Sequence, residues 1–324
     1  MRKYLSLATL LIFCLLTCCK GKPYSFYIPD GTPLLCTAKM CVDNSKSSYD
    51  IRYNRVSGTE LISKMLSETA DIVIAPLISL VNMHNSNHFY TLLGIVTFDN
   101  NFLVAKESFN HEGSLVDNLY GEIIISYQRN NVSGLLMNVM LKNENVNIIN
   151  TISDKRPDMI NILYVANASD VTPIFRINNE IKFAVMPEPA TSLMKILGFD
   201  VISSLSSLIG ESAIPQAGLA VKKKLLDNNR NLAAFLLAKL RESTDYLFSN
   251  PDEVIDICIN KLQSPSLSNE AALKLFISER GSSILVVKSS EEVRDSISLL
   301  LGYCLEINSS LIGDKLPSED FYFS

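Results

Sequence analysis

The sequence predicts an α/β fold built on doubly wound sheets, and three observations lead to this fold class. Hydrophobic residues make up 47% and charged residues 19% of the 324 residues, which is ample material for a core. Short apolar runs that end at a proline or a turn alternate with segments of helical period. The first elements follow the order strand, helix, strand, helix, strand, which is typical of parallel sheets covered by helices. The length allows two domains of ~150 residues each.

The first α/β unit has recognisable helix starts. Its expected elements are strand 24–28, helix 34–42, strand 50–56, helix 61–66 and strand 71–75. Thr32 is the expected N-cap of the first helix, because Pro33 behind it suits the first helical position. Ser57 and Glu60 have the spacing of a capping box before the second helix. The run that ends at Pro76 is short and apolar, as in a buried parallel strand.

The rest of the chain repeats this pattern and then becomes mostly helical. The expected elements are two extended stretches within 89–105, strand 121–126, helix 134–141, strand 182–186, helix 190–197, strand 217–221, and helices 232–248, 269–280 and 291–305. Gly198 suits the residue just after a helix end. The expected N-caps are Asn250 for a helix that starts at the next residue, Ser268 for helix 269–280, and Ser289 or Ser290 for the last helix.

The N-terminus predicts an exported lipoprotein. Two basic residues precede an apolar stretch over 5–16, which is too short to span a membrane and typical of a signal peptide over 1–18. A leucine and a threonine then precede two cysteines, which resembles a bacterial lipobox with Cys19 as the lipidated residue and Cys18 as the alternative. Residues 19–23 would form a short tether that joins the lipid anchor to the folded body. Several acyl chains on one cysteine give stable anchoring.

Charge and missing motifs exclude several classes of protein. The net charge of −5, from 29 basic and 34 acidic residues, argues against a nucleic-acid partner. The sequence contains no nucleotide-binding glycine motif, no nucleophile elbow and no CxxC pair, so nucleotide binding, a nucleophile elbow and a zinc or thioredoxin-like site lack support and we expect no cofactor. His84 and His88 are four residues apart, but 85–87 favour a loop, so we expect no metal site. We expect free, buried thiols at positions 36, 41, 258 and 304.

The candidate binding residues lie in turns that follow strands. In an open α/β sheet, ligands bind at the carboxyl ends of the strands, and helix N-termini there favour anions. The richest of these turns is 127–131, although a solvated loop is the alternative for it, as a simple turn is for 30–31. The predicted ligand-binding residues are Asp30, Gly31, Thr32, Pro76, Leu77, Thr97, Tyr127, Gln128, Arg129, Asn130 and Glu188.

The charges among these residues suggest a mixed polar solute. The Arg129 guanidinium could hold a sulfonate, carboxylate or phosphate with two parallel hydrogen bonds. Asp30 and Glu188 would instead attract a cationic or amine-bearing group if they face the same cleft. Together they predict a small zwitterionic or mixed polar solute with an anionic end. The alternatives are that Arg129 forms a salt bridge with Asp30 or Glu188, or that it lies on the surface.

A series of short motifs gives the sequence a family resemblance. In chain order they are 28–33, 38–39, 56–58, 70–76, 93–97, 187–190, 214–217, 313–317 and 320–322. Their order resembles that of the solute-binding proteins of ABC importers, in the branch that binds sulfonates, taurine, nitrate and thiamine pyrimidines. The likeness covers nearly all of 24–323. One departure is the polar segment 128–133, which stands where the family usually has a glycine-rich turn.

The resemblance implies a two-lobe periplasmic binding protein fold of type II, with doubly wound mixed sheets and two hinge crossings. We place the crossings near 105–108 and 212–216. The first lobe would then consist of 24–106 and 215–324, and the second lobe of 107–214. Solute would bind between the lobes and shift an equilibrium between open and closed forms.

The resemblance also implies a function in transport. The protein would be a monomeric, non-enzymatic substrate-binding lipoprotein, held by its lipid anchor on the extracytoplasmic side of the cell membrane. It would deliver a small-molecule solute to an ABC permease that works with a separate ATPase. Two alternatives remain at this point. One is a same-fold biosynthetic enzyme of the menaquinone or thiamine-precursor type, and the other is a surface adhesin lipoprotein.

Overall fold

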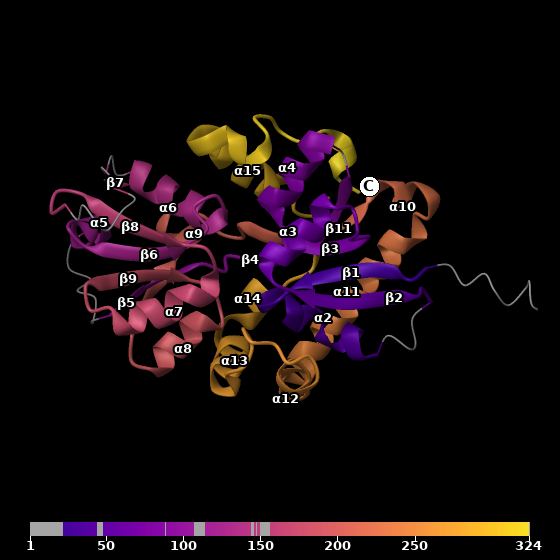
Figure 1. Cartoon of the computed structure of the whole chain (residues 1–324), viewed down its shortest axis with the longest axis horizontal. Coiled ribbons are helices and arrows are strands. Elements are labelled where there is room, and N and C mark those ends of the chain that lie inside the picture. Colours follow the sequence, from indigo (N-terminus) through magenta and orange to yellow (C-terminus); the bar gives the residue numbers. More distant parts are fainter. Residues whose placement is uncertain are drawn as a thin grey trace, which may run out of the picture.

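The structure is a computed structural model with two α/β lobes lying side by side (Figure 1). It describes residues 22–43, 48–87, 89–106, 114–143, 146, 148–149 and 156–323. The predicted signal peptide, both candidate lipidation sites and His88 lie outside the described residues. Each lobe contains one six-stranded sheet with helices on both faces. This confirms the predicted fold class.

The sheet of the first lobe combines the N-terminal strands with one strand from much later in the chain. Its strands are β1 (Tyr24–Pro29), β2 (Ile51–Val56), β3 (Ile72–Pro76), β4 (Tyr90–Phe98), β11 (Pro215–Lys222) and β12 (Lys288–Ser289), in the spatial order β12-β4-β11-β3-β1-β2. β1 runs parallel to β2 and β3, whereas β11 is antiparallel to both β3 and β4. The helices of this part are α2 (Thr32–Val42), α3 (Gly58–Leu66) and α4 (Leu77–Asn87).

The sheet of the second lobe is parallel at its centre and antiparallel at one side. Its strands are β5 (Phe102–Ala105), β6 (Ile123–Tyr127), β7 (Ile148–Ile149), β8 (Ile160–Val165), β9 (Ile181–Met186) and β10 (Asp200–Ser204), in the spatial order β10-β5-β9-β6-β8-β7. β6 is parallel to β8 and β9, and β5 is antiparallel to β9 and β10. The helices are α5 (Leu115–Leu119), α6 (Val132–Asn143), α7 (Ala168–Ile177), α8 (Ala190–Ile196) and α9 (Leu205–Leu208).

The chain passes between the sheets at two adjacent segments. β5 belongs to the second sheet, where Phe102 pairs with Met186, so the first crossing lies at 99–101 and the prediction of 105–108 is wrong. The chain returns through 209–214, which overlaps the second predicted crossing. The Asp99 carboxylate accepts main-chain hydrogen bonds from Ala213 (2.6 Å) and Ile214 (2.8 Å), which ties the two crossings together. The lobes as independent domains remain a prediction.

The C-terminal third is helical and touches both lobes. Its elements are α10 (Lys223–Asn228), α11 (Asn231–Ser249), α12 (Pro251–Asp256), α13 (Glu270–Phe276), α14 (Ser282–Ile284) and α15 (Arg294–Asn308), with short π-helical turns η2 (Ile257–Lys261) and η3 (Ile277–Gly281) and 3₁₀ turns η4 (Ser309–Ile312) and η5 (Glu319–Phe321). α13 packs on α8, and α15 packs on α6. The C-terminal helices therefore lie against the second lobe on two sides (Figure 1).

Three hydrophobic clusters form the core of the described residues. One cluster fills the space between sheet 1 and the helices α2 and α11–α14. A second, smaller cluster lies between sheet 2 and the helices α7 and α8. The third is continuous across both lobes, because it contains Leu136 of α6 as well as Leu301 of α15, both of which are almost fully buried. The first cluster also includes Phe102 of β5, so apolar contacts join the lobes on both sides, and the more extensive shared core lies on the α15 side.

Several helix starts differ from the predicted ones. Gly31, not Thr32, is the N-cap of α2, because the Thr32 hydroxyl donates instead to the carbonyl oxygen of Glu188 (2.6 Å). Asn269, not Ser268, caps α13 and accepts from the N–H of residue 272 (2.9 Å). The predicted cap of α3 is present, because the main-chain N–H of residue 60 donates to the Ser57 hydroxyl oxygen (3.2 Å). A local motif of this spacing was therefore predicted correctly, while long-range contacts changed others.

One further helix start was predicted wrongly, whereas α12 begins at Pro251 as predicted, with Asn250 at the N-cap position. The last helix begins at Arg294, because the Ser289 hydroxyl and main chain instead hydrogen-bond to the Glu292 carboxylate (2.7 and 2.6 Å) in the preceding turn. Asn250 makes no side-chain capping bond, and its amide instead lies 3.4 Å from the Tyr246 carbonyl oxygen. In both places the polar side chain bonds a turn or the helix before it.

α4 was not predicted, since its last three residues were expected to form a loop. The helix continues through Asn87 because its apolar side packs into the core and His84 is fully buried. The ring nitrogens of His84 lie 3.2 Å from the Tyr90 carbonyl oxygen and 3.0 Å from the Ser318 hydroxyl. These partners account for a buried histidine without a metal ion. Within the described residues, no group of three or more histidine, cysteine or acidic residues could hold one.

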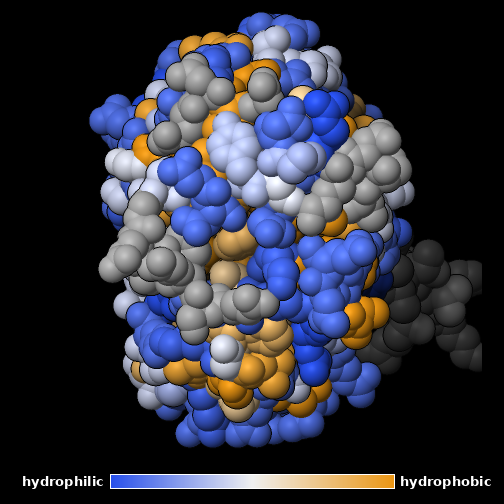
Figure 2. Space-filling model, turned by 90° about the vertical axis from the view of Figure 1, so that its left-hand side faces the viewer, coloured by the Kyte–Doolittle hydropathy of each residue, from blue (hydrophilic) through white to orange (hydrophobic). Residues whose placement is uncertain are grey.

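Figure 2 shows the outer face of the second lobe, where polar and apolar surface is unevenly spread. Hydrophobic residues gather toward the lower part of this face, and polar residues dominate its remaining visible surface. The large hydrophobic residues that this lobe exposes are Tyr120, Ile177, Ile196 and Leu197. None of the described helices is both long and apolar enough to cross a bilayer.

Candidate functional site

A cavity of about 760 Å³ lies between the two lobes, beside the first crossing. Its walls come from the carboxyl ends of β1, β3, β6 and β9, from the N-terminal turns of α2, α3, α6 and α7, and from the loop before α13. Strand ends and helix starts thus converge on one space from both lobes. Such a place is where open α/β sheets bind ligands.

Ten of the eleven predicted binding residues line this cavity. They are Asp30, Gly31, Thr32, Pro76, Thr97, Tyr127, Gln128, Arg129, Asn130 and Glu188. The exception is Leu77, which begins α4 and is fully buried in the core. Only some side chains near a strand end face the crevice, and the Leu77 side chain belongs to the buried hydrophobic core instead. The prediction for Leu77 is therefore wrong.

The loop between β6 and α6 presents Arg129 to the cavity. Gln128 takes a left-handed conformation (φ 47°), and its side-chain oxygen accepts from the Asn131 amide (2.8 Å). Asn131 also accepts from the N–H of Val132 (2.8 Å), which fixes the start of α6. Arg129 itself is exposed, and no carboxylate of the described residues pairs with it. The guanidinium is therefore available to a solute.

Tyr127 has a structural role at the base of this loop. Its side chain is buried, and burial raises the pKa of its phenol. The hydroxyl donates to the side-chain oxygen of Asn101 (2.6 Å), which lies in the first crossing. The Ser133 hydroxyl in turn donates to the carbonyl oxygen of Tyr127 (3.0 Å). Tyr127 thus joins the end of β6 to the crossing and presents only part of its ring to the cavity.

Asp30 lines the cavity, but its carboxylate is already bonded on both oxygens. One oxygen accepts from the Ser264 hydroxyl (2.6 Å), and the other accepts from the main-chain N–H of Ser266 (3.1 Å). The Arg55 guanidinium lies 3.5 Å away and balances the charge. Asp30 therefore holds the loop before α13 in place, and this loop forms one wall of the cavity. A cation-binding role for Asp30 is not supported.

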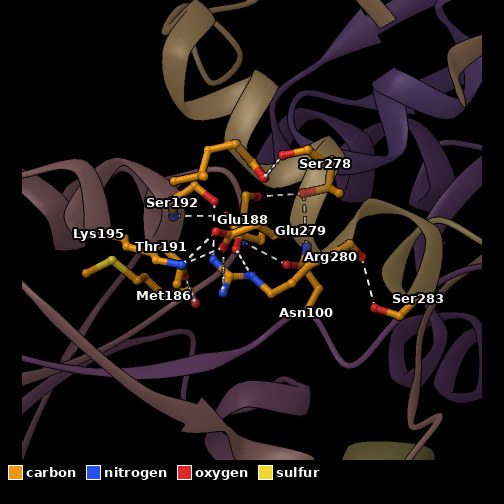
Figure 3. Close-up of polar contacts among 12 residues, drawn as sticks. Asn100, Met186, Glu188, Thr191, Ser192, Lys195, Ser278, Glu279, Arg280 and Ser283 are labelled. Carbon is orange, nitrogen blue, oxygen red and sulfur yellow. Dashed lines mark hydrogen bonds and ion pairs between the residues drawn. The ribbon is translucent and has the colours of Figure 1, made fainter.

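Glu188 is buried, and all its polar groups are occupied (Figure 3). One carboxylate oxygen accepts from Arg280 Nε (2.7 Å), and the other accepts from the Ser192 N–H (3.0 Å). Its main-chain N–H donates to the Asn100 side chain (2.8 Å), and its carbonyl accepts from Thr32 (2.6 Å). Its negative charge is matched by Arg280, so it does not offer a free carboxylate to a solute.

These pairings determine which charged side chains of the cavity are free to contact a solute. Asp30 and Glu188 have partners of their own, so the predicted alternative in which either one forms a salt bridge with Arg129 is wrong. Arg129 remains the charged group of the lining without a counter-ion in the described chain. The N-termini of α2, α6 and α7 add partial positive charge at the same cavity. The site therefore favours an anionic group over a cationic one.

Sequence reasoning missed part of the lining. The additional polar residues are Ser79, Asn100, Asn101, Asn131, Ser133, Ser169, Thr172, Gln216, Ser266, Ser268 and Asn269. Most come from the unpredicted helix α7 or from loops whose position depends on distant contacts. Gln216 could have been found, because it directly precedes the predicted strand 217–221 and follows Pro215. Its side-chain nitrogen is buried without a hydrogen-bond partner in the structure.

No protein-family model matches the sequence, and no curated protein matches it significantly. Solved structures do match. An ABC transporter protein from Parabacteroides distasonis superposes with a TM-score of 0.73 at 14% identity, covering 94% of this chain and 99% of the other. The periplasmic aliphatic sulphonate-binding protein SsuA from Escherichia coli gives 0.71 at 11% identity, covering 94% and 93%.

A third match has a solute in its name. The alkanesulfonate-binding protein SsuA from Xanthomonas axonopodis, bound to MOPS, superposes with a TM-score of 0.66 at 11% identity, covering 94% of this chain and 98% of the other. At such identities the likeness shows the fold. The chain therefore has the two-lobe, type II fold of periplasmic binding proteins. Its structural neighbours include sulfonate-binding proteins, which belong to the branch that the sequence resembles.

Proposed function

We propose that this chain is the solute-binding component of a bacterial ABC importer and that it captures a small anionic solute between its lobes. The observation that carries the proposal is the cavity at the lobe junction, where Arg129 has no counter-ion among the described residues while both nearby carboxylates are paired. The structural neighbours are described as transport components, which favours this function over a same-fold biosynthetic enzyme or an adhesin.

The solute that fits this site differs from the zwitterion that the sequence suggested. Asp30 and Glu188 are committed to Ser264 and Arg280, so an amine on the solute would find no free carboxylate among them. The lining also includes apolar side chains, such as Leu61, Ile62 and Leu193. A solute with one anionic group and an apolar portion, such as an organic sulfonate or carboxylate, matches both features.

Capture would proceed by closure of the lobes around the solute. The closed form would then dock, as a monomer, on a permease whose transport is driven by a separate ATPase subunit. The chain itself would carry out no catalysis. Cys19, or alternatively Cys18, would carry the lipid that holds the protein on the extracytoplasmic side of the cell membrane.

The role of Arg129 is tested by calorimetry with a panel of n-alkanesulfonates, matched n-alkanecarboxylates and n-alkylamines. We expect the anions to bind and the amines not to bind. Arg129→Lys keeps the charge but loses the planar fork, so affinity should fall at least tenfold, ~1.4 kcal/mol, with an unchanged melting temperature without solute. Arg156→Lys is the matched control, since Arg156 pairs with Asp158 (3.1 Å) outside the cavity. Wild-type affinity in Arg129→Lys would remove this residue from the site.

The anchor is tested by mass spectrometry of the mature N-terminus. We expect cleavage before Cys19 and the mass of an acylated cysteine on it. Cys19→Ala should leave an uncleaved or released precursor. An unmodified Cys19, or a mature chain that starts at Lys20, would contradict lipidation at Cys19, and an acylated N-terminal Cys18 would support the alternative site.

A further inference from the structure

The interface between the two lobes has two sides of different character. On one side α15 packs against α6, and Leu301 and Leu136 belong to one buried hydrophobic cluster that extends through both lobes. The ion pair Lys142–Glu306 (2.8 Å) lies over this contact, and about half of each side chain is exposed. Separating the lobes here would expose apolar core to water at roughly 25 cal/mol per Å².

On the other side α8 lies against α13 and η3, and the contacts are mainly ionic (Figure 3). Glu188 receives the Arg280 guanidinium at 2.7 Å, and Lys195 lies 2.7 and 2.8 Å from the two oxygens of Glu279. The apolar residues of α8 and α13 belong to separate clusters, as Met194 and Phe276 illustrate. Phe102 of the second sheet belongs to the cluster of Phe276, and the Arg280 guanidinium lies 5.0 Å from the Phe102 ring centroid, so the apolar contact on this side involves β5 rather than α8.

The ionic side is connected directly to the cavity through Glu188. Its main chain bonds Thr32 of the first lobe and Asn100 of the crossing, while its carboxylate bonds Arg280. Because this carboxylate is buried, removal of the arginine would leave an uncompensated charge. In an open form both ions could instead be hydrated, so their separation is far less costly than exposure of a core.

We propose that Glu188, Lys195, Glu279 and Arg280 form an ionic latch that holds the lobes closed before solute binds. The cleft opens on this side, between α8 and η3, and the motion turns about the apolar contact between α15 and α6. The latch goes beyond solute binding itself, because it sets how often the empty protein is closed. Its strength therefore contributes to the apparent affinity for any solute.

The chain offers a matched pair of variants for the test. Lys195→Glu places a negative charge opposite Glu279 on the ionic side, and Lys142→Glu does the same opposite Glu306 on the apolar side. Both lysines are about half exposed, so neither change buries a charge. Arg280→Gln removes the buried partner of Glu188. The measurement is hydrogen exchange by mass spectrometry on the mature full chain without added solute.

We expect Lys195→Glu to accelerate exchange at least tenfold in peptides that cover 187–196 and 277–284. Peptides that cover 136–143 and 297–304 should keep wild-type rates, and Lys142→Glu should leave all four regions unchanged. Arg280→Gln should act like Lys195→Glu and more strongly. Equal acceleration in all regions would indicate general destabilisation and overturn the latch, as would unchanged exchange at 187–196 in Lys195→Glu. No solute is used, so the result is independent of the proposed function.

Discussion

Gly134 stands in the first turn of α6, directly under the loop that carries Arg129. A Cβ atom at this position would lie 2.2 Å from the carbonyl oxygen of Arg129 and 2.7 Å from its carbonyl carbon. Both are main-chain atoms, so no side chain can rotate away to relieve the contact. Reaching even 3.0 Å from the oxygen requires a movement of roughly 0.8 Å. We therefore predict that Gly134→Ala displaces this loop.

The magnitude follows from two opposing effects. Alanine normally stabilises a helix interior by about 1 kcal/mol relative to glycine. Overpacking typically costs about 1–3 kcal/mol, and clashes with two main-chain atoms put this site in the upper part of that range, at roughly 2–3 kcal/mol. The net free energy of unfolding should therefore fall by about 1–2 kcal/mol. Gly302→Ala is the control, since Gly302 lies on an exposed part of α15 with no atom within 4 Å of a built Cβ. This variant should gain up to about 1 kcal/mol.

Urea unfolding followed by circular dichroism measures both variants under one set of conditions. Opposite signs for the two substitutions would support the close approach of the Arg129 loop to α6. If Gly134→Ala proved as stable as wild type, or more stable, the geometry described for this loop would be wrong. A displaced loop should also weaken the binding of anions, which calorimetry can follow separately.

Two further predictions concern pH and thiol reactivity. Burial opposes ionisation of Asp71, but hydrogen bonds from Ser25 and the ammonium of Lys222 outweigh it and lower the pKa. The stability that this lowered pKa adds is present above the unfolded pKa of about 3.9 and is lost as pH falls through the folded pKa. Asp71→Asn should therefore lower the free energy of unfolding by roughly 1.5–3 kcal/mol at pH 7 and by much less near pH 2. An equal loss at both pH values would contradict this. Burial raises the pKa of three free thiols to about 12, so they should resist iodoacetamide at pH 8 until urea unfolds the chain, and fast native alkylation would show that they are accessible. These thiols are Cys36, Cys258 and Cys304.

Local patterns predicted the fold class well, because they depend on neighbouring residues. Ser57 caps its helix as expected, since the hydrogen bond spans three positions. α4 was missed, because the polar residues at its end indicate a loop and only tertiary packing around His84 makes them helical. β5 was placed in the wrong lobe, since an extended segment carries no local sign of which sheet it will join.

The sequence predicted which residues line the cavity better than it predicted what each of them does there. Turns after strands predicted most of the cavity lining, because parallel strands end at one edge of a sheet. The free or bonded state of each carboxylate depended on distant residues. Asp30 hydrogen-bonds to Ser264, which is 234 residues away in the sequence, and Glu188 hydrogen-bonds to Arg280, which is 92 residues away. Neither pairing follows from a local motif. For this reason the sequence suggested a zwitterionic solute, whereas the paired carboxylates favour an anionic one.

The position of β11 has a consequence for how the chain folds. This strand lies between β3 and β4 at the centre of the first sheet, yet residues 99–214 separate it from β4. During synthesis or export the N-terminal strands emerge first, with the place beside β3 and β4 still vacant. An unstructured loop of that length would cost about 4 kcal/mol to close, and prior folding of the second lobe shortens it. We therefore expect the inserted lobe to form early, and the lobe that contains the N-terminus to be completed last.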